Sequence, residues 1–148
     1  MWWYDPDKVA KLHGIDGGWH IRTMPLYGDL QRIENELTAL GIGPDASLQE
    51  AQLQPFDQLH YHGIDAVRAA AGLIGLGRGQ RVLDLGAGFG GPARHLAHTV
   101  GCHVTALELQ PDVHDLAASL TRRCGLDELV DHVLGDALTC SLPDNAFD

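Results

Sequence analysis

The sequence is poor in cysteine, with Cys102, Cys124 and Cys140 as the only three in 148 residues. Their number is odd and they form no CxxC pair, so neither a disulfide framework nor a zinc knuckle is expected. Cys102 and Cys124 fall in apolar patterns and are predicted to act as small hydrophobic side chains. The nine histidines are scattered, without HExxH spacing, and no metal site is predicted. This composition favours a reducing, cytoplasmic location.

Long apolar runs are also missing. No stretch of 18 apolar residues occurs, which argues against a membrane span. The first residues, Met-Trp-Trp-Tyr-Asp-Pro-Asp, have neither the basic start nor the apolar centre of a secretory signal. Aromatic residues are concentrated in this segment, where they could anchor a lid or pack on a neighbouring surface: Trp2, Trp3, Tyr4 and Trp19.

Basic residues are scarce. Lys and Arg total 10 against 20 Asp and Glu, which gives a formal net charge of −10. Both the first 80 residues and the rest are acidic, so no basic face is available to neutralise nucleic-acid phosphates or an anionic membrane. A small molecule is therefore the expected partner, and neither nucleic acid nor a membrane is.

The pattern divides the chain into two regions. Residues 1–78 are predicted to form an N-terminal helical cap or lid, and residues 79–148 alternate between strand and helix. In the first region we expect a helix over 26–40, a capping box at Ser47–Glu50 that starts a second helix, and an amphipathic helix over 64–76. Two of these helices carry apolar stripes that we interpret as packing surfaces. The helix over 26–40 has Leu30, Ile33, Leu37 and Leu40, and the helix over 64–76 has Ile64, Val67, Ala71 and Ile74.

The second region predicts half of a doubly wound parallel sheet, a Rossmann-like α/β fold with its first three strands. Proline is placed to open each crossover helix, and glycine closes the second. The charged pairs Arg122-Arg123 and Asp127-Glu128 are interpreted as a solvated face. The expected elements are strands at 81–85, 102–109 and 130–134 and helices at 92–100 and 111–124.

A glycine-rich loop follows the first predicted strand. Gly86-Ala87-Gly88-Phe-Gly90-Gly91 satisfies the GxGxxG pattern of dinucleotide-binding loops, a weak signal on its own. Glycine suits a sharp turn with positive φ and a ligand that lies against the backbone. The loop would lie at the carboxyl end of its strand, where open α/β sheets bind ligands.

Acidic residues stand at the ends of all three predicted strands: Asp84, Glu108 and Asp136. Asp84 would repel a pyrophosphate but attract the ammonium and sulfonium groups of S-adenosylmethionine. Glu108 could accept hydrogen bonds from ribose hydroxyls of either NAD or S-adenosylmethionine. Asp136 could accept one from an adenine amino group, or could simply form a turn. Together the three favour an adenosine ligand without phosphate.

Residues 57–148 resemble the class I S-adenosylmethionine-dependent methyltransferases of the small-molecule type. The likeness extends to the sarcosine/dimethylglycine and glycine/sarcosine N-methyltransferase group. It is carried by Asp57-Gln-Leu-His-Tyr-His-Gly63, VLDLGAGFGGPARHLA at 82–97, GCHVTALEL at 101–109, GDAL at 135–138 and LPDNAFD at 142–148.

The resemblance implies roles by position. The loop of Gly86, Ala87, Gly88 and Gly90 would pass under the methionine part of S-adenosylmethionine, with Asp84 near its ammonium. Glu108 would hold the ribose, Leu109 would lie against the adenine, and Asp136 and Ala137 would meet the adenine edge. The residues expected to cover the cofactor are Asp57, Gln58, His60 and Tyr61.

The implied reaction is transfer of the sulfonium methyl to a small-molecule acceptor, and an amine nitrogen, as in the sarcosine/dimethylglycine group, is one candidate. His60 and Tyr61 are the candidate catalytic bases. The resemblance also implies a fourth strand after 142–148, so the sequence corresponds to the front half of such an enzyme, truncated after the third strand. Two alternatives remain: a fragment of an NAD(P)-dependent oxidoreductase, and a non-catalytic module that binds S-adenosylmethionine.

Overall fold

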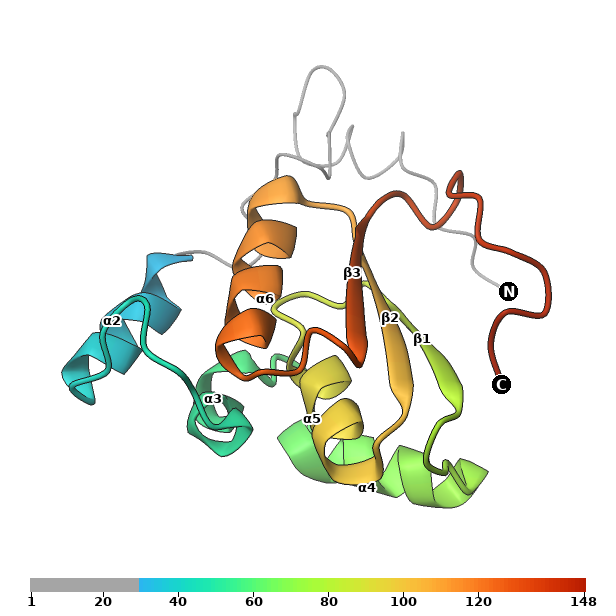
Figure 1. Cartoon of the computed structure of the whole chain (residues 1–148), viewed down its shortest axis with the longest axis horizontal. Helices are drawn as coiled ribbons and strands as arrows, with labels where there is room; N and C mark the ends of the chain where they lie inside the picture. The colour runs from blue at the N-terminus through green and yellow to red at the C-terminus, as the bar shows by residue number, and fades with distance from the viewer. Residues whose placement is uncertain (1–29) are drawn as a thin grey trace, which may run out of the picture.

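The computed structural model describes residues 30–148, which form a three-stranded sheet and five helices (Figure 1). Residues 1–29, which include the four N-terminal aromatics, lie outside this range, and the packing or lid role predicted for them stays a prediction. In chain order the elements are α2 (Gln31–Ala39), α3 (Glu50–Asp57), α4 (Gly63–Ile74), β1 (Arg81–Leu85), α5 (Gly91–Val100), β2 (His103–Glu108), α6 (Pro111–Arg123) and β3 (Val130–Leu134).

The sheet is parallel, with strand order β1-β2-β3. Leu85 of β1 pairs with Leu107 of β2, and Glu108 pairs with Leu134 of β3. The carboxyl ends of all three strands therefore meet at one edge, which confirms the predicted Rossmann-like α/β arrangement.

Helices α5 and α6 cover one face of the sheet (Figure 1). Small side chains allow α5 to approach the strands closely: Ala93 and Ala97 are fully or almost fully buried against the sheet's core. Cys102, directly before β2, is also fully buried in this cluster, and burial raises the pKa of its thiol. The thiol is therefore protonated and inert, as its apolar pattern predicted.

A second core joins the N-terminal helices to the rest. Ile33 and Leu37 of α2 are fully buried, in a cluster with Leu53 of α3, Leu120 of α6 and Phe89 of the glycine-rich loop. Their predicted packing role is confirmed. The fourth residue of the predicted stripe, Leu40, lies beyond the helix as its C-cap and is largely exposed.

Two local predictions were wrong. Helix α3 begins at Glu50, two residues later than a cap at Ser47 would give; Gln49 is the N-cap, and its backbone N–H donates to Gln52 Oε1 at 2.7 Å. Arg123 is not part of a solvated face, since its side chain is only 8 % exposed. Its guanidinium donates to the carbonyls of Ala46 and Gly43 and to Glu34, so it fastens the α2–α3 connection to the end of α6.

Helix α4 packs on α5, but none of its residues is buried. Its predicted apolar stripe is only partly covered, and Ile74 is 73 % exposed. Leu73 beside it is also largely exposed. Within residues 30–148, no helix combines the length and the apolar character needed to cross a bilayer.

The segment after β3 returns to the free edge of β1 (Figure 1). The backbone N–H of Asp148 donates to the Arg81 carbonyl at 2.9 Å, and the Arg81 N–H donates to Asp148 Oδ2 at 2.8 Å. Residues at positions 81 and 148 therefore lie side by side.

Candidate functional site

The glycine-rich loop turns sharply off β1. Gly86, Gly88 and Gly90 have φ values of 72°, 55° and 75°, a region that other residues rarely adopt. The N–H groups of Gly86 and Ala87 both donate to the Leu107 carbonyl, at 2.9 and 3.0 Å. The loop is thus held against the end of β2, in the place and conformation that the sequence predicted.

Glu108, the last residue of β2, reaches back to this loop. Its Oε2 accepts the Gly88 N–H at 2.9 Å, and its Oε1 accepts the N–H groups of Leu109 and Gln110, each at 2.9 Å. The side chain is almost completely buried. Glu108 therefore shapes the loop as well as standing at the position predicted for a ribose ligand. A carboxylate offers about four acceptor positions, so one is left for a ligand.

Asp84 borders a cleft of about 540 Å³ between β1 and α4. The Asp84 Oδ2 atom is buried and has no hydrogen-bond partner within residues 30–148. Burial raises the pKa of this carboxyl group, while the nearby His60 lowers it and Glu108 raises it further. Gly86, Ala87 and His60 line the same cleft, and its remaining walls are mostly apolar. The arrangement places a poorly solvated carboxylate beside the glycine loop.

The segment His60-Tyr61-His62 connects α3 to α4 as a turn rather than lying on a helix. His60 borders the cleft, and its Nε2 donates to the Gly63 carbonyl at 2.9 Å. Tyr61 is 93 % exposed and does not line the Asp84 cleft. His62 has φ 65° as the N-cap of α4. The structure therefore brings His60, and not Tyr61, to Asp84.

Beyond β3, Asp136 forms a turn. Its Oδ1 accepts the Leu138 N–H at 2.9 Å, and its carbonyl accepts the N–H groups of Thr139 and Cys140. Asp136 thus has the turn role that the sequence offered as an alternative to binding the adenine amino group. Ala137 is exposed and Leu109 is half-buried, on the loops that follow β3 and β2. All three residues thus lie at the carboxyl edge of the sheet.

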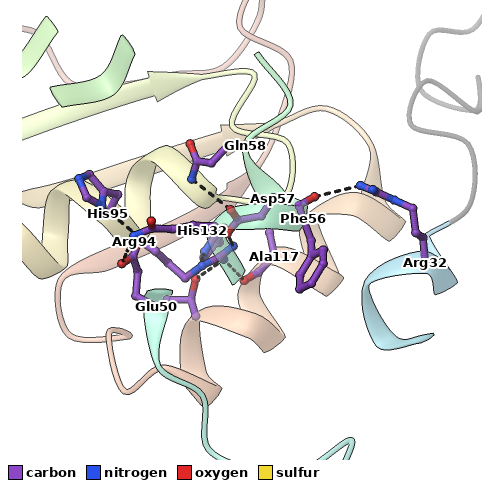
Figure 2. A network of polar contacts seen from close by, with 11 residues as sticks. Arg32, Glu50, Phe56, Asp57, Gln58, Arg94, His95, Ala117 and His132 are labelled. Carbon is purple, nitrogen blue, oxygen red and sulfur yellow. Dashed lines mark hydrogen bonds and ion pairs between the residues drawn. The ribbon is translucent and has the colours of Figure 1, made fainter. Parts of the chain in front are cut away.

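A buried polar network beneath the loop was missed by sequence reasoning (Figure 2). Arg94 of α5 donates to Asp57 Oδ2 at 2.8 Å, and both side chains are at most 2 % exposed. Arg94 also donates to Thr121, whose hydroxyl lies 2.8 Å from His132 Nε2. Asp57 and Arg94 are 37 positions apart, so no spacing in the sequence joins them. The only signal was the presence of Arg94 among the alanine and leucine residues of α5.

A second pair joins the same two helices. His95 Nδ1 lies 3.1 Å from Glu50 Oε1, and both side chains are buried. Figure 2 shows this pair and the Asp57–Arg94 pair, both of which join α3 to α5. No group of three His, Cys, Asp or Glu side chains in the part that the structure describes is arranged to hold a metal ion.

The sequence of this region matches a known protein family. Residues 82–148, from β1 through β3, match a family model described as a methyltransferase domain. The match supports a class I S-adenosylmethionine-dependent methyltransferase domain in this segment. The glycine loop and the acidic strand ends described above all lie inside the matched methyltransferase segment.

Individual relatives agree with the family but differ in acceptor. This chain is similar to a glycine/sarcosine/dimethylglycine N-methyltransferase from Actinopolyspora halophila, with 43 % identity over 82 residues that cover 55 % of the chain. It is also similar to a sterol 24-C-methyltransferase from Gibberella zeae, with 40 % identity over 75 residues and 51 % of this chain. The matches cover only 14 % and 20 % of those two proteins.

A solved structure supports the same fold. The crystal structure of a putative sarcosine dimethylglycine methyltransferase from Galdieria sulphuraria superposes with a TM-score of 0.53 and 27 % identity. The match covers 56 % of this chain and 32 % of that one. The matched part of this chain therefore spans about a third of that protein.

Proposed function

We propose that this chain binds S-adenosylmethionine as part of an enzyme that transfers its methyl group to a small molecule. One observation carries the proposal: the buried Oδ2 of Asp84 has no partner within residues 30–148 and stands beside the glycine loop. An unpaired buried carboxylate is costly, so the site favours a ligand that brings a positive charge or a hydrogen-bond donor.

The charge at this position also argues against a dinucleotide. A pyrophosphate against Gly86 would meet Asp84, with Glu108 nearby, and like charges repel in a poorly solvated site. The ammonium of S-adenosylmethionine reverses the sign of that interaction. An NAD(P)-dependent oxidoreductase is therefore disfavoured, although the loop satisfies GxGxxG.

The remaining residues at the sheet edge fit the rest of the molecule. Glu108 has one acceptor position left for a ribose hydroxyl, and Leu109 would pack on the adenine. Asp136 and Ala137 would meet the adenine edge, with the Asp136 side chain already ordered by the Leu138 N–H. The backbone of the loop residues would lie under the methionine part: Gly86, Ala87, Gly88 and Gly90.

S-adenosylmethionine supplies a methyl group activated by the sulfonium charge, so the protein's task is mainly alignment and exclusion of water. His60 is the proposed base. Its Nε2–H is engaged by the Gly63 carbonyl, so the neutral ring presents Nδ1 as its proton acceptor. A proton leaving a protonated acceptor could pass to Nδ1. Tyr61 is the weaker candidate because it points into solvent.

The acceptor proposed is a small molecule with an amine nitrogen, supported by the name of the Actinopolyspora halophila relative. A carbon acceptor is the competing possibility, since the Gibberella zeae relative is named for C-methylation of a sterol. A cytoplasmic location is proposed from the free thiols Cys102, Cys124 and Cys140.

Calorimetric titration of the chain with S-adenosylhomocysteine and with NADH tests the proposal. We expect S-adenosylhomocysteine to bind and NADH not to. D84N should weaken that binding at least ten-fold, while D65N, a change at an exposed carboxylate on α4, should leave it unchanged. Binding of NADH instead, or equal affinity of D84N and the wild type, would overturn the assignment of Asp84.

A further inference from the structure

The buried Asp57–Arg94 pair is not among the cofactor contacts proposed above, although Asp57 lines the same cleft as Asp84 and was expected from the sequence to cover the cofactor. Its two charged groups are 2.8 Å apart and almost completely excluded from water, and Arg94 is 0 % exposed. Removing one member of such a pair leaves an uncompensated buried charge. The two side chains are therefore held in one conformation. Backbone segments that pack against them are constrained to the same positions.

The pair touches the last two glycines of the loop. A Cβ on Gly91 would lie 2.6 Å from the Asp57 carbonyl oxygen and 2.8 Å from Asp57 Cγ, distances at which something must move. A Cβ on Gly90 would lie 3.0 Å from Arg94 Nη1 and 2.9 Å from His132 Cε1. The missing side chains at these two positions thus make room for the ion pair and its neighbours.

Asp57 is also the last residue of α3, three positions before His60. The turn that carries His60 to the cleft therefore begins at a residue held by Arg94. Figure 2 shows Asp57 and the following Gln58 approaching the first turn of α5, where Arg94 lies. Gln58 adds a hydrogen bond to Asp57 Oδ1 at 3.1 Å. The same ion pair can thus set two walls of the cleft: the glycine loop and the His60 turn.

We propose that Asp57 and Arg94 are positioning residues for the cofactor cleft, acting through Gly90, Gly91 and the His60 turn. The proposal rests on the proposed function, because it names what shapes the site for S-adenosylmethionine. It distinguishes this pair from Glu50–His95, which joins the same two helices and is similarly buried. The Glu50–His95 pair borders neither the cleft nor a loop glycine.

The test compares the two pairs in the full chain. R94Q, D57N and R94K are matched with E50Q, and each variant is measured by thermal unfolding and by calorimetric titration with S-adenosylhomocysteine. We expect R94Q and D57N to raise the Kd at least ten-fold. R94K should recover part of the affinity because it keeps the charge. E50Q should lower Tm comparably while changing Kd less than three-fold.

A readout independent of ligand keeps the two proposals apart. Backbone amide NMR signals of Gly90 and Gly91 should shift in D57N and R94K but not in E50Q. If the wild type fails to bind S-adenosylhomocysteine, the proposed function fails and these signals still decide the positioning role. Unchanged glycine signals would overturn that role. So would a folded D57N with wild-type affinity, or equal losses of affinity in E50Q and D57N. If R94Q does not fold, D57N and R94K carry the comparison.

Discussion

Oε2 of Glu108 accepts the N–H of Gly88 at 2.9 Å, so the carboxylate that ends β2 holds the centre of the loop that follows β1. Two more N–H groups, those of Leu109 and Gln110, donate to its other oxygen. Glu108, which the sequence predicted to bind the ribose of a ligand, thus also accepts hydrogen bonds that hold the loop. Its loss should affect the apo protein before any ligand is added.

E108A removes these three acceptor contacts and leaves buried N–H groups unpaired. We expect a loss of about 1.5–3 kcal/mol in the free energy of unfolding, the usual range for hydrogen bonds to a charged group. Urea denaturation measures it. E128Q, at an exposed position on the α6–β3 connection, serves as the control and should change stability by less than about 0.5 kcal/mol. Equal stability of E108A and the wild type would show that the loop does not depend on Glu108.

Asp84 should make the unliganded protein less stable as pH rises. Burial raises the pKa of its carboxyl in the folded state above the ordinary value of 3.8, so the folded state holds the proton more tightly than the unfolded state. The associated stability is present below pH 3.8 and is lost as pH rises through the raised pKa. D84N removes the ionisation. The Tm difference, D84N minus wild type, should therefore increase from pH 4 to pH 7, and a constant difference would contradict this.

His132 should make the protein less stable as pH falls, the opposite of the effect of Asp84. Burial, followed by the nearby Arg94, lowers the pKa of its imidazole from 6.5 to about 4, so the unfolded state binds the proton more tightly. Stability should fall as pH is lowered from about 6.5 to 4. H132Q should flatten that part of the Tm profile. H103Q, at an exposed position of β2, should not, and identical profiles for H132Q and the wild type would refute the assignment.

Two glycine-to-alanine changes should have opposite signs. G91A places a Cβ within 2.8 Å of three atoms of Asp57 and Gln58, and should destabilise the protein by about 1–3 kcal/mol, as overpacking does. G72A lies in the exposed interior of α4 with nothing within 4 Å, and should stabilise it by about 0.8–1.0 kcal/mol through helix propensity. Chemical denaturation of the two variants measures both. A stabilising G91A would mean that α3 does not pack against Gly91 in solution.

The sequence was sufficient for the sheet. Strong local signals fixed β1, β2 and β3: short apolar runs, glycine at the turns, and Pro92 and Pro111 at the starts of α5 and α6. The positions of Asp84 and Glu108 followed, because parallel strands bring their carboxyl ends to one edge. These predictions were correct because they depended only on neighbouring residues in the sequence and on a general rule of sheet topology.

Contacts between distant residues could not be obtained in this way. The carboxylate partner of Arg94 is 37 positions away, and the three partners of Arg123 are 77 or more positions away, so neither charge showed its burial in the local pattern. The stripe on α4 failed for a related reason. Its period describes an amphipathic helix, but only packing decides how much of that face is covered, and Ile74 stays exposed.

Phe89 anchors the glycine loop in the N-terminal core. Its side chain is 2 % exposed and belongs to the core formed by α2, α3 and α6 rather than to the core under the sheet. The loop is therefore packed against helices whose core side chains, such as Ile33 and Leu37, do not line the cleft. A cavity made at Ile33 or Leu37 of α2 should be transmitted to the backbone at position 89. Substitutions far from the cleft can thus tune affinity there without altering a single ligand contact.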